Sequence, residues 1–311
     1  MPTPTGVSSS RDVPPRAAVA DIDACYTAFI ASRLLQITLL ALAAIALLAG
    51  CGGDGESGGD QTEGLTPDEL LEQAANAFSE QSAYRLAFET EVDAGAGPSA
   101  LPPSSPFGLL AGLGMVSGEG PVQPPDASLD VAADFGPFSA QANLTWVDSR
   151  LFLSIVGRDF EIETGEAVGD LDIAAGARTL LGWIENPMET ERVKIDGVST
   201  VRLNANIDRD AVIDDLGPLL TDDGVSDETR SQLKDAVTRG DIDIWIGESD
   251  LLPRQIEVGL TLDGEVDELP LATLGLDAKL NFSDFGTSTT ISAPDNPQAL
   301  PLDDLGSILD G

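Results

Sequence analysis

The side chains that most enzymes use for nucleophilic and metal chemistry are nearly absent from this chain. It has 311 residues and no histidine, and its only cysteines are Cys25 and Cys51. Without histidine the chain cannot form a Ser-His-Asp triad, a Cys-His pair, an HExxH zinc site or a histidine pH switch. Two thiols are too few for a thiolate zinc or iron–sulfur site. We therefore expect no enzyme activity, no cofactor and no metal.

Carboxylates are the one reactive group present in large number. They are dense in residues 208–215 and again in 222–228. Calcium requires several oxygen ligands around one centre, but neither run has the alternating acids and the glycine of an EF-hand loop. We interpret Asp208 and Asp227 as helix caps and the other acids as a solvated face, with structural calcium as the alternative.

Cys51 stands in a setting that predicts a covalent modification. Arg33 precedes an apolar helical run over 34–47, and residues 48–51 are Leu-Ala-Gly-Cys. The run is shorter than the roughly 20 residues of a transmembrane helix and is typical of a signal peptide. Leu-Ala-Gly-Cys resembles the bacterial lipobox, which implies lipid on the Cys51 thiol and cleavage just before it. We expect a chain outside the cytoplasm, anchored by this lipid to the outer face of the cytoplasmic membrane; an uncleaved anchor is the alternative.

This motif divides the chain into three parts. Residues 1–50 are expected to be an N-terminal extension and signal peptide, and residues 51–64, rich in glycine and acids, a flexible tether. Residues 65–311 show no convincing internal boundary and are expected to form one domain. The formal charge is −37, from 53 acidic and 16 basic side chains. Such a charge argues against binding nucleic acid and against electrostatic docking on anionic headgroups.

The first part of the expected domain combines a helix with a meander. Thr66, Pro67 and the acids that follow predict a helix that runs to about residue 81. Alternating apolar and polar residues predict antiparallel strands at 84–92, 128–133, 139–147, 150–156 and 160–162.

Residues 94–115 are rich in both proline and apolar side chains, and residues 112–118 are rich in glycine. We expect residues 94–115 to form a loop that packs on the core and residues 112–118 to be a flexible loop. A lid over a ligand, or a membrane contact, is the alternative.

The second part of the expected domain again combines helices with antiparallel strands. A helix is expected over 174–185, ended by Asn186-Pro187, followed by a hairpin around Asp196-Gly197. The patterns then predict helices at 208–220 and 227–238, strands at 241–247, 254–262 and 271–285, and an irregular tail. This order predicts an α+β fold in which a large curved antiparallel β-sheet packs against a few helices.

The order of elements behind the lipobox resembles the LppX–LprAFG family of actinobacterial lipoproteins and, more distantly, the LolA-like lipoprotein carriers. The hairpin over 243–256, with Leu252-Pro253-Arg254 between its strands, carries the strongest local likeness. The resemblance implies a half-barrel whose concave face is covered by helices and encloses a hydrophobic cavity. Proteins of this kind bind the acyl chains of lipids or glycolipids and carry them through the cell envelope. The loop 94–115 and the high acidity depart from the family pattern and leave the ligand open.

A curved sheet with one apolar face buries more apolar surface than a few helices can cover, and acyl chains can cover the remainder. Inward-facing strand residues are therefore the candidates for lining a cavity, with ordinary core packing as the alternative for each. They are Leu86, Phe88, Leu129, Val131, Leu144, Phe152, Ile244, Val258 and Leu260.

Three functions follow, in this order. The first is a membrane-anchored lipoprotein that binds lipid or glycolipid and carries it, with a large apolar cavity. The second is a cell-surface interaction lipoprotein with a filled core and no ligand cavity. The third is a hydrolase with two close carboxylates, which ranks last because no acidic pair stands out by its surroundings. Trp146, Trp183 and Trp245 could stack on sugars, but core packing is the favoured interpretation for them.

Overall fold

The computed structural model describes residues 59–96, 114–135, 138–163, 182–220, 226–264 and 271–301. The predicted signal segment, Cys51, residues 97–113 of the predicted loop and most of the predicted helix 174–185 lie outside these ranges. The three-part division of the chain therefore stays a prediction.

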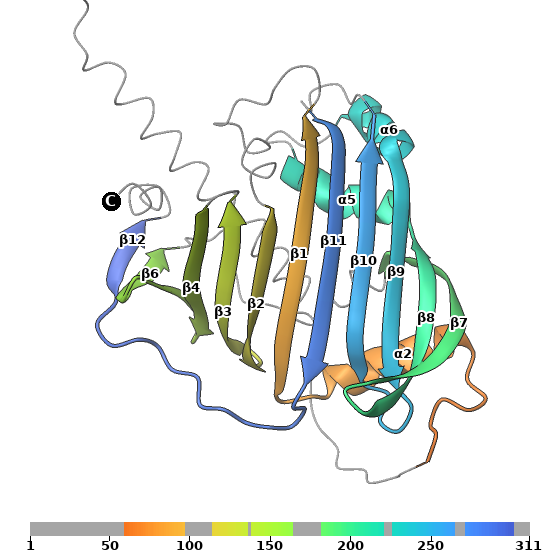
Figure 1. Cartoon of the computed structure of the whole chain (residues 1–311), viewed down its shortest axis with the longest axis horizontal. Helices are drawn as coiled ribbons and strands as arrows, with labels where there is room; N and C mark the ends of the chain where they lie inside the picture. The colour runs from red at the N-terminus through yellow and green to blue at the C-terminus, as the bar shows by residue number, and fades with distance from the viewer. Residues whose placement is uncertain are drawn as a thin grey trace, which may run out of the picture.

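A single open sheet of twelve strands dominates the fold (Figure 1). Its order is β12-β6-β5-β4-β3-β2-β1-β11-β10-β9-β8-β7, and all neighbours are antiparallel except β12 and β6. The strands are β1 (Tyr84–Ala96), β2 (Met115–Gln123), β3 (Asp126–Phe135), β4 (Phe138–Val147), β5 (Arg150–Ile155), β6 (Arg158–Glu163), β7 (Ile184–Ile195), β8 (Val198–Ile207), β9 (Val237–Gly247), β10 (Pro253–Asp263), β11 (Leu271–Ser283) and β12 (Gln298–Pro301). Because β11 pairs with both β1 and β10, it joins the two predicted halves into one sheet.

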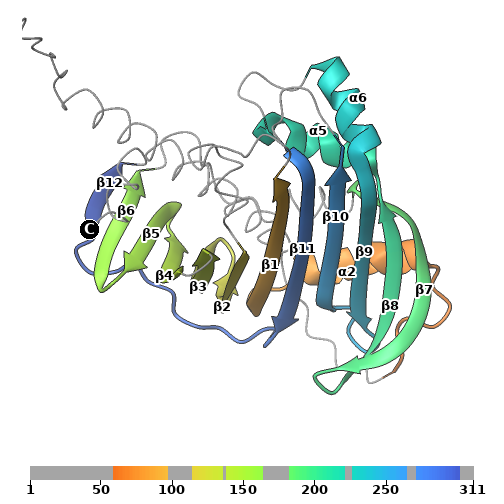
Figure 2. The same cartoon turned by 45° about the horizontal axis from the view of Figure 1, so that its top comes forward.

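Three helices accompany the sheet in the described residues: α2 (Pro67–Ser79), α5 (Arg209–Leu220) and α6 (Asp227–Ala236). Figure 2 shows the sheet curving, with α2 on its concave side. The predicted α+β fold, a large curved antiparallel sheet with helices on the concave face, is confirmed.

The start of α2 follows from its first residues. The hydroxyl of Thr66 accepts a hydrogen bond from the backbone N–H of Glu69, and the Glu69 carboxylate accepts one from the backbone N–H of Thr66. This capping box satisfies two amide groups that no helical carbonyl can reach. Leu70, Ala74 and Phe78 then form one buried stripe against the sheet, as the helical spacing predicts.

Residues 94–96 and 115–118 were expected to be loop, but the first three end β1 and the other four begin β2. Gly118 and Gly120 occupy the positions of β2 that face Phe88 and Leu86 of β1, and Glu119 faces Ala87 on the other side. Two glycines at inward positions hide the alternation of apolar residues on which a strand prediction depends. The prediction of a flexible loop at 115–118 is therefore wrong.

The predicted helix 174–185 is also wrong at its end, since Ile184 and Glu185 already belong to β7. Asn186-Pro187 does not stop a helix there but falls in an irregularity between Glu185 and Met188. A proline is tolerated at this place because β7 is the edge strand and pairs only with β8.

Two further boundaries differ from the prediction. Ser226, and not Asp227, caps α6, because its hydroxyl accepts the backbone N–H of Thr229. The tail was expected to be irregular, yet Gln298–Pro301 adds β12 beside β6. A four-residue edge strand is too short to carry an alternation pattern, so the sequence gives little sign of it.

Candidate functional site

One face of the sheet, which we call the inner face, is the face against which α2 packs. The pairing registers place Leu86 beside Phe282, Phe88 beside Leu280, and Leu129 beside Leu144. Eight of the nine predicted residues lie on this face and belong to, or pack against, one apolar cluster. They are Leu86, Phe88, Leu129, Val131, Leu144, Ile244, Val258 and Leu260.

The ninth predicted residue, Phe152, lies on the opposite face, so its prediction as inward-facing is wrong. It pairs with Thr145 and Glu161, whereas its neighbours Leu151 and Leu153 face the inner cluster. The Phe152 ring is fully buried, and the Arg150 guanidinium lies 5.0 Å from its centroid. Residues 151–153 are apolar without a break, so the sequence alternation could not assign their faces.

Burial along the inner face changes from one end of the sheet to the other. At the end where β1 begins, which we call the closed end, the inward side chains are buried: Tyr84, Val122, Trp146, Leu151 and Phe282. At the other end, which we call the open end, inward side chains of β1, β2, β3, β5 and β11 are only half-buried: Val92, Val116, Ala133, Ile155 and Leu276. These five strands thus share one apolar surface that is incompletely covered at the open end.

The helices explain this difference. At the closed end Phe78 of α2 packs against Tyr84 and Phe282, with ring centroids 5.0 Å apart in both pairs. The hydroxyl of Tyr84 is buried there without a hydrogen-bond partner, and burial raises the pKa of this phenol. At the open end α6 contacts β9 and β10. Figures 1 and 2 also show α5 at the open end, beside β1 and β11, whereas β3 to β5 lie away from both helices.

The outer face of the sheet is polar and rich in ion pairs. Both Oδ atoms of Asp243 accept hydrogen bonds from Arg202, at 2.9 and 3.0 Å, and Asn204 donates a third at 2.9 Å. Burial opposes ionisation of Asp243, but these hydrogen bonds outweigh it and lower its pKa. The Arg202 guanidinium also lies 5.0 Å from the Trp245 ring, which places Trp245 on the outer face. Trp146, by contrast, is part of the inner cluster.

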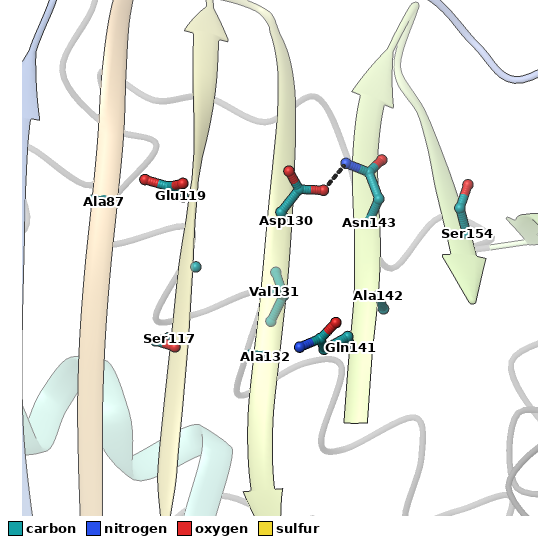
Figure 3. A pocket seen from close by; sticks show the side chains of 11 residues that line it. Ala87, Ser117, Glu119, Asp130, Val131, Ala132, Gln141, Ala142, Asn143 and Ser154 are labelled. Carbon is teal, nitrogen blue, oxygen red and sulfur yellow. Dashed lines mark hydrogen bonds between the residues drawn. The ribbon is translucent and has the colours of Figure 1, made fainter. Parts of the chain in front are cut away.

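A depression of about 600 Å³ hollows this outer face over β1 to β5 (Figure 3). Glu119, Asp130, Gln141 and Asn143 line it, and the Asn143 amide donates to Asp130 at 3.0 Å. It is open to solvent, and its lining is about half polar and half apolar, so it is not the enclosed apolar cavity that the resemblance implies. No pattern in the sequence shows that this face is hollowed.

In the described parts of the two acidic runs, the aspartates cap helices or form ion pairs between them. Asp208 caps α5, because its carboxylate accepts the backbone N–H groups of Asp210 and Ala211 at 2.8 and 3.2 Å. Asp214 pairs with Arg230 of α6, which ties α5 to α6. Within the described ranges no three acidic or thiol side chains are arranged to hold a metal ion.

Several residues of the half-buried surface were not predicted. Val116 was missed because β2 was missed, and Leu153, Ile155 and Leu276 were on predicted strands but not singled out. None of the helices that the structure describes is both long and apolar enough to span a bilayer.

No protein-family model matches this sequence, and no curated protein matches it. Among solved structures the fold is similar to LprF from Mycobacterium bovis, at 16% identity and a TM-score of 0.45, over 73% of this chain and 96% of that one. It is also similar to the Mycobacterium tuberculosis lipoprotein LppX, at 11% identity and a TM-score of 0.43, over 73% and 100% of the two chains. A putative outer membrane lipoprotein-sorting protein domain from Vibrio parahaemolyticus matches at 10% identity and a TM-score of 0.19, over 72% and 94%.

LprF and LppX belong to the family that the sequence resembles, so the predicted resemblance reappears among solved structures. Identities of 16% or less and TM-scores below 0.5 are too low for these structures to carry a functional argument. The function must therefore be argued from this chain's own residues.

Proposed function

We propose that this chain is a membrane-anchored lipoprotein that binds the acyl chains of a lipid or glycolipid and carries them through the cell envelope. The observation that carries this proposal is the half-buried apolar surface at the open end of the inner face. Val116, Val131 and Leu153 lie on three strands of this surface, and each is half-buried and packs against the main cluster.

The magnitude of apolar transfer favours an acyl chain as the ligand. Each methylene group removed from water contributes roughly 0.8 kcal/mol, so ten of them contribute about 8 kcal/mol before the costs of ordering. On β1, β2, β3 and β11 the inward positions toward the open end carry aliphatic side chains and the Thr90 hydroxyl, and no charge. Such a surface would hold the hydrocarbon part of a lipid and leave its headgroup toward solvent.

The lipobox supports the anchor. Acyl chains on Cys51 would hold the protein at the membrane, and the formal charge of −37 would keep the domain from lying on anionic headgroups. Together these features suit a protein that stays near a membrane and exposes a binding surface to the envelope.

The test is a titration of the chain from residue 52 onward, which lacks Cys51, with a fluorescent fatty acid that brightens in apolar surroundings. We expect saturable binding that an unlabelled phospholipid displaces. Binding that does not saturate, or that no lipid displaces, would contradict the proposal and favour the surface-interaction lipoprotein without a ligand cavity.

A further inference from the structure

The first described residues of the chain are fastened to the closed end of the sheet. The carboxylate of Asp60 lies 2.7 Å from the Arg192 guanidinium on β7, and Arg192 also bonds Glu248 at 3.0 Å. The backbone N–H of Gln61 donates to the carbonyl of Glu248 at 2.7 Å, and the Gln61 amide donates to the carbonyl of Ser249. We call this set of contacts, made by residues 60–62, the clamp.

The clamp is built as a unit. Thr62 is 4% exposed, and both its backbone N–H and its hydroxyl donate to Asp60. The hydroxyl contact is the main cause of the lowered pKa of Asp60, so this carboxylate is ionised and available to Arg192 at neutral pH. A single exposed ion pair contributes little, but here a charged pair, a backbone hydrogen bond and a buried threonine act together.

The clamp lies at the closed end. It contacts the turn between β9 and β10, and the backbone N–H of Glu248 donates to Ser199 near the start of β8. The residue at the other end of β10 is Asp263, which the ten steps from Pro253 place about 33 Å away at ~3.3 Å per step. Figure 1 shows the β9–β10 turn and the tip of β10 at opposite ends of the sheet.

We propose that the clamp orients the domain on its membrane, with the closed end toward the lipid anchor and the open end of the inner face away from it. This inference rests on the anchor at Cys51 in the proposed function, but not on the lipid cargo. Lipid would then enter and leave at an end remote from the anchoring bilayer.

Whether the clamp can orient the domain depends on how far the segment between Cys51 and the first fixed residue can reach, compared with the length of the sheet. With the clamp closed, nine residue steps lead from Cys51 to the fixed Asp60, a reach of at most about 32 Å. That is no longer than the ~33 Å between the two ends of β10. With the clamp open, the first fixed residue is Thr66 at the cap of α2, and fifteen residue steps from Cys51 give a reach of about 54 Å. A closed clamp therefore prevents the domain from standing with its open end toward the membrane, and an open clamp allows it.

The experiment uses the lipidated chain purified from membranes and reconstituted into vesicles. Mass spectrometry first shows whether Cys51 carries acyl chains; an unmodified chain would remove the anchor and with it this inference. A donor fluorophore is then placed, through a non-natural amino acid, at Asp196 or at Asp263. Both aspartates are exposed, Asp196 in the β7–β8 turn at the closed end and Asp263 at the open end.

Energy transfer to acceptor-labelled headgroups measures the distance of each position from the bilayer. Because about 33 Å of strand separates the two ends, we expect transfer from position 196 to exceed that from 263 by about threefold or more. The double variant Asp60→Ala/Gln61→Pro removes the ion pair, the amide contact and the backbone donor, and should bring the ratio close to one. Asp60→Ala alone should lower the ratio partly, and Glu63→Ala, outside the clamp, should leave it unchanged.

Equal transfer from the two positions in the unaltered chain would overturn the proposal. So would a ratio that the double variant leaves unchanged while circular dichroism shows the chain folded. Neither result depends on whether lipid binds to the inner face, so a failure here is distinct from a failure of the cargo proposal.

Discussion

Phe88 on β1 lies so close to Gly118 on β2 that a Cβ atom added at Gly118 would stand 2.6 Å from Cε1 of the ring. The ring thus fills the space that a side chain on β2 would take, and it is 4% exposed. The glycine that hid β2 from sequence analysis is therefore the residue that lets the inner cluster continue from β1 toward β3.

Gly118→Ala is expected to destabilise the domain by about 1–3 kcal/mol, because the Phe88 ring must move in a packed cluster. Urea unfolding followed by tryptophan fluorescence measures the change. Gly114→Ala is the matched control, since its Cβ would meet only the Asp134 carbonyl oxygen at 3.7 Å. Equal stabilities of the two variants would show that the contact between Phe88 and Gly118 is not as close as described.

How far the sequence predicts this fold is clear from β2 and β3. On β3 the alternation of Leu129 and Val131 with Asp130 and Ala132 predicts both the strand and its inward face. On β2 two inward positions are glycine, so the same rule gives no signal. The prediction of which face of the sheet Phe152 occupies failed for the opposite reason. Every residue in the run 151–153 is apolar, so there is no alternation from which to assign a face.

The candidate site too could be predicted from the sequence only in part. Inward positions can be predicted residue by residue, but the gradient of burial along the strands depends on where α2 ends, and no local pattern contains that. The clamp joins Asp60 to Arg192, which are 132 residues apart, so only the structure brings them together.

Val131→Asp and Ala132→Asp form a second matched pair, one residue apart on β3. Val131 lies on the inner face at the open end and Ala132 on the outer face. A charge at position 131 would have to be desolvated when an acyl chain binds, so we expect Val131→Asp to weaken fatty-acid binding tenfold or more, at about 1.4 kcal/mol per tenfold. Ala132→Asp should bind as the unaltered chain does, and equal losses in both variants would contradict binding on the inner face.

Phe152→Ala tests the corrected position of Phe152. Because the side chain is fully buried, its loss should cost about 3–5 kcal/mol of unfolding free energy. Because it lies on the outer face, the lipid bound per folded molecule should not change. Binding assays below the melting temperature separate the two effects, and a loss of binding in molecules that circular dichroism shows to be folded would place Phe152 on the binding surface after all.

Asp243 is expected to make stability depend on pH. Its pKa is lowered in the folded state by Arg202 and Asn204 against the effect of burial. The stability it contributes is therefore fully present above the ordinary aspartate pKa of 3.8 and is lost as pH falls through the lowered folded-state pKa. At neutral pH Asp243→Asn should cost about 1.5–3 kcal/mol, the usual contribution of a hydrogen bond to a charged group.

Urea unfolding at a series of pH values checks this. The difference between the unaltered chain and Asp243→Asn should be constant down to the ordinary pKa and shrink below it. Ser231→Ala, at an exposed position of α6, changes no ionisable group and is the control, so its effect on stability should be the same at every pH. A difference that persists unchanged into strong acid would mean that Asp243 acts through its shape and not through its charge.

The most direct test of the lipid-carrier account is native mass spectrometry, with organic extraction, of the chain from residue 52 onward produced in a lipid-rich bacterial host. The account predicts a stoichiometric lipid that co-purifies with the chain and is depleted in Val131→Asp but not in Ala132→Asp. A folded, monodisperse chain that carries no lipid, and that takes up none from added bacterial lipid extract, would contradict it.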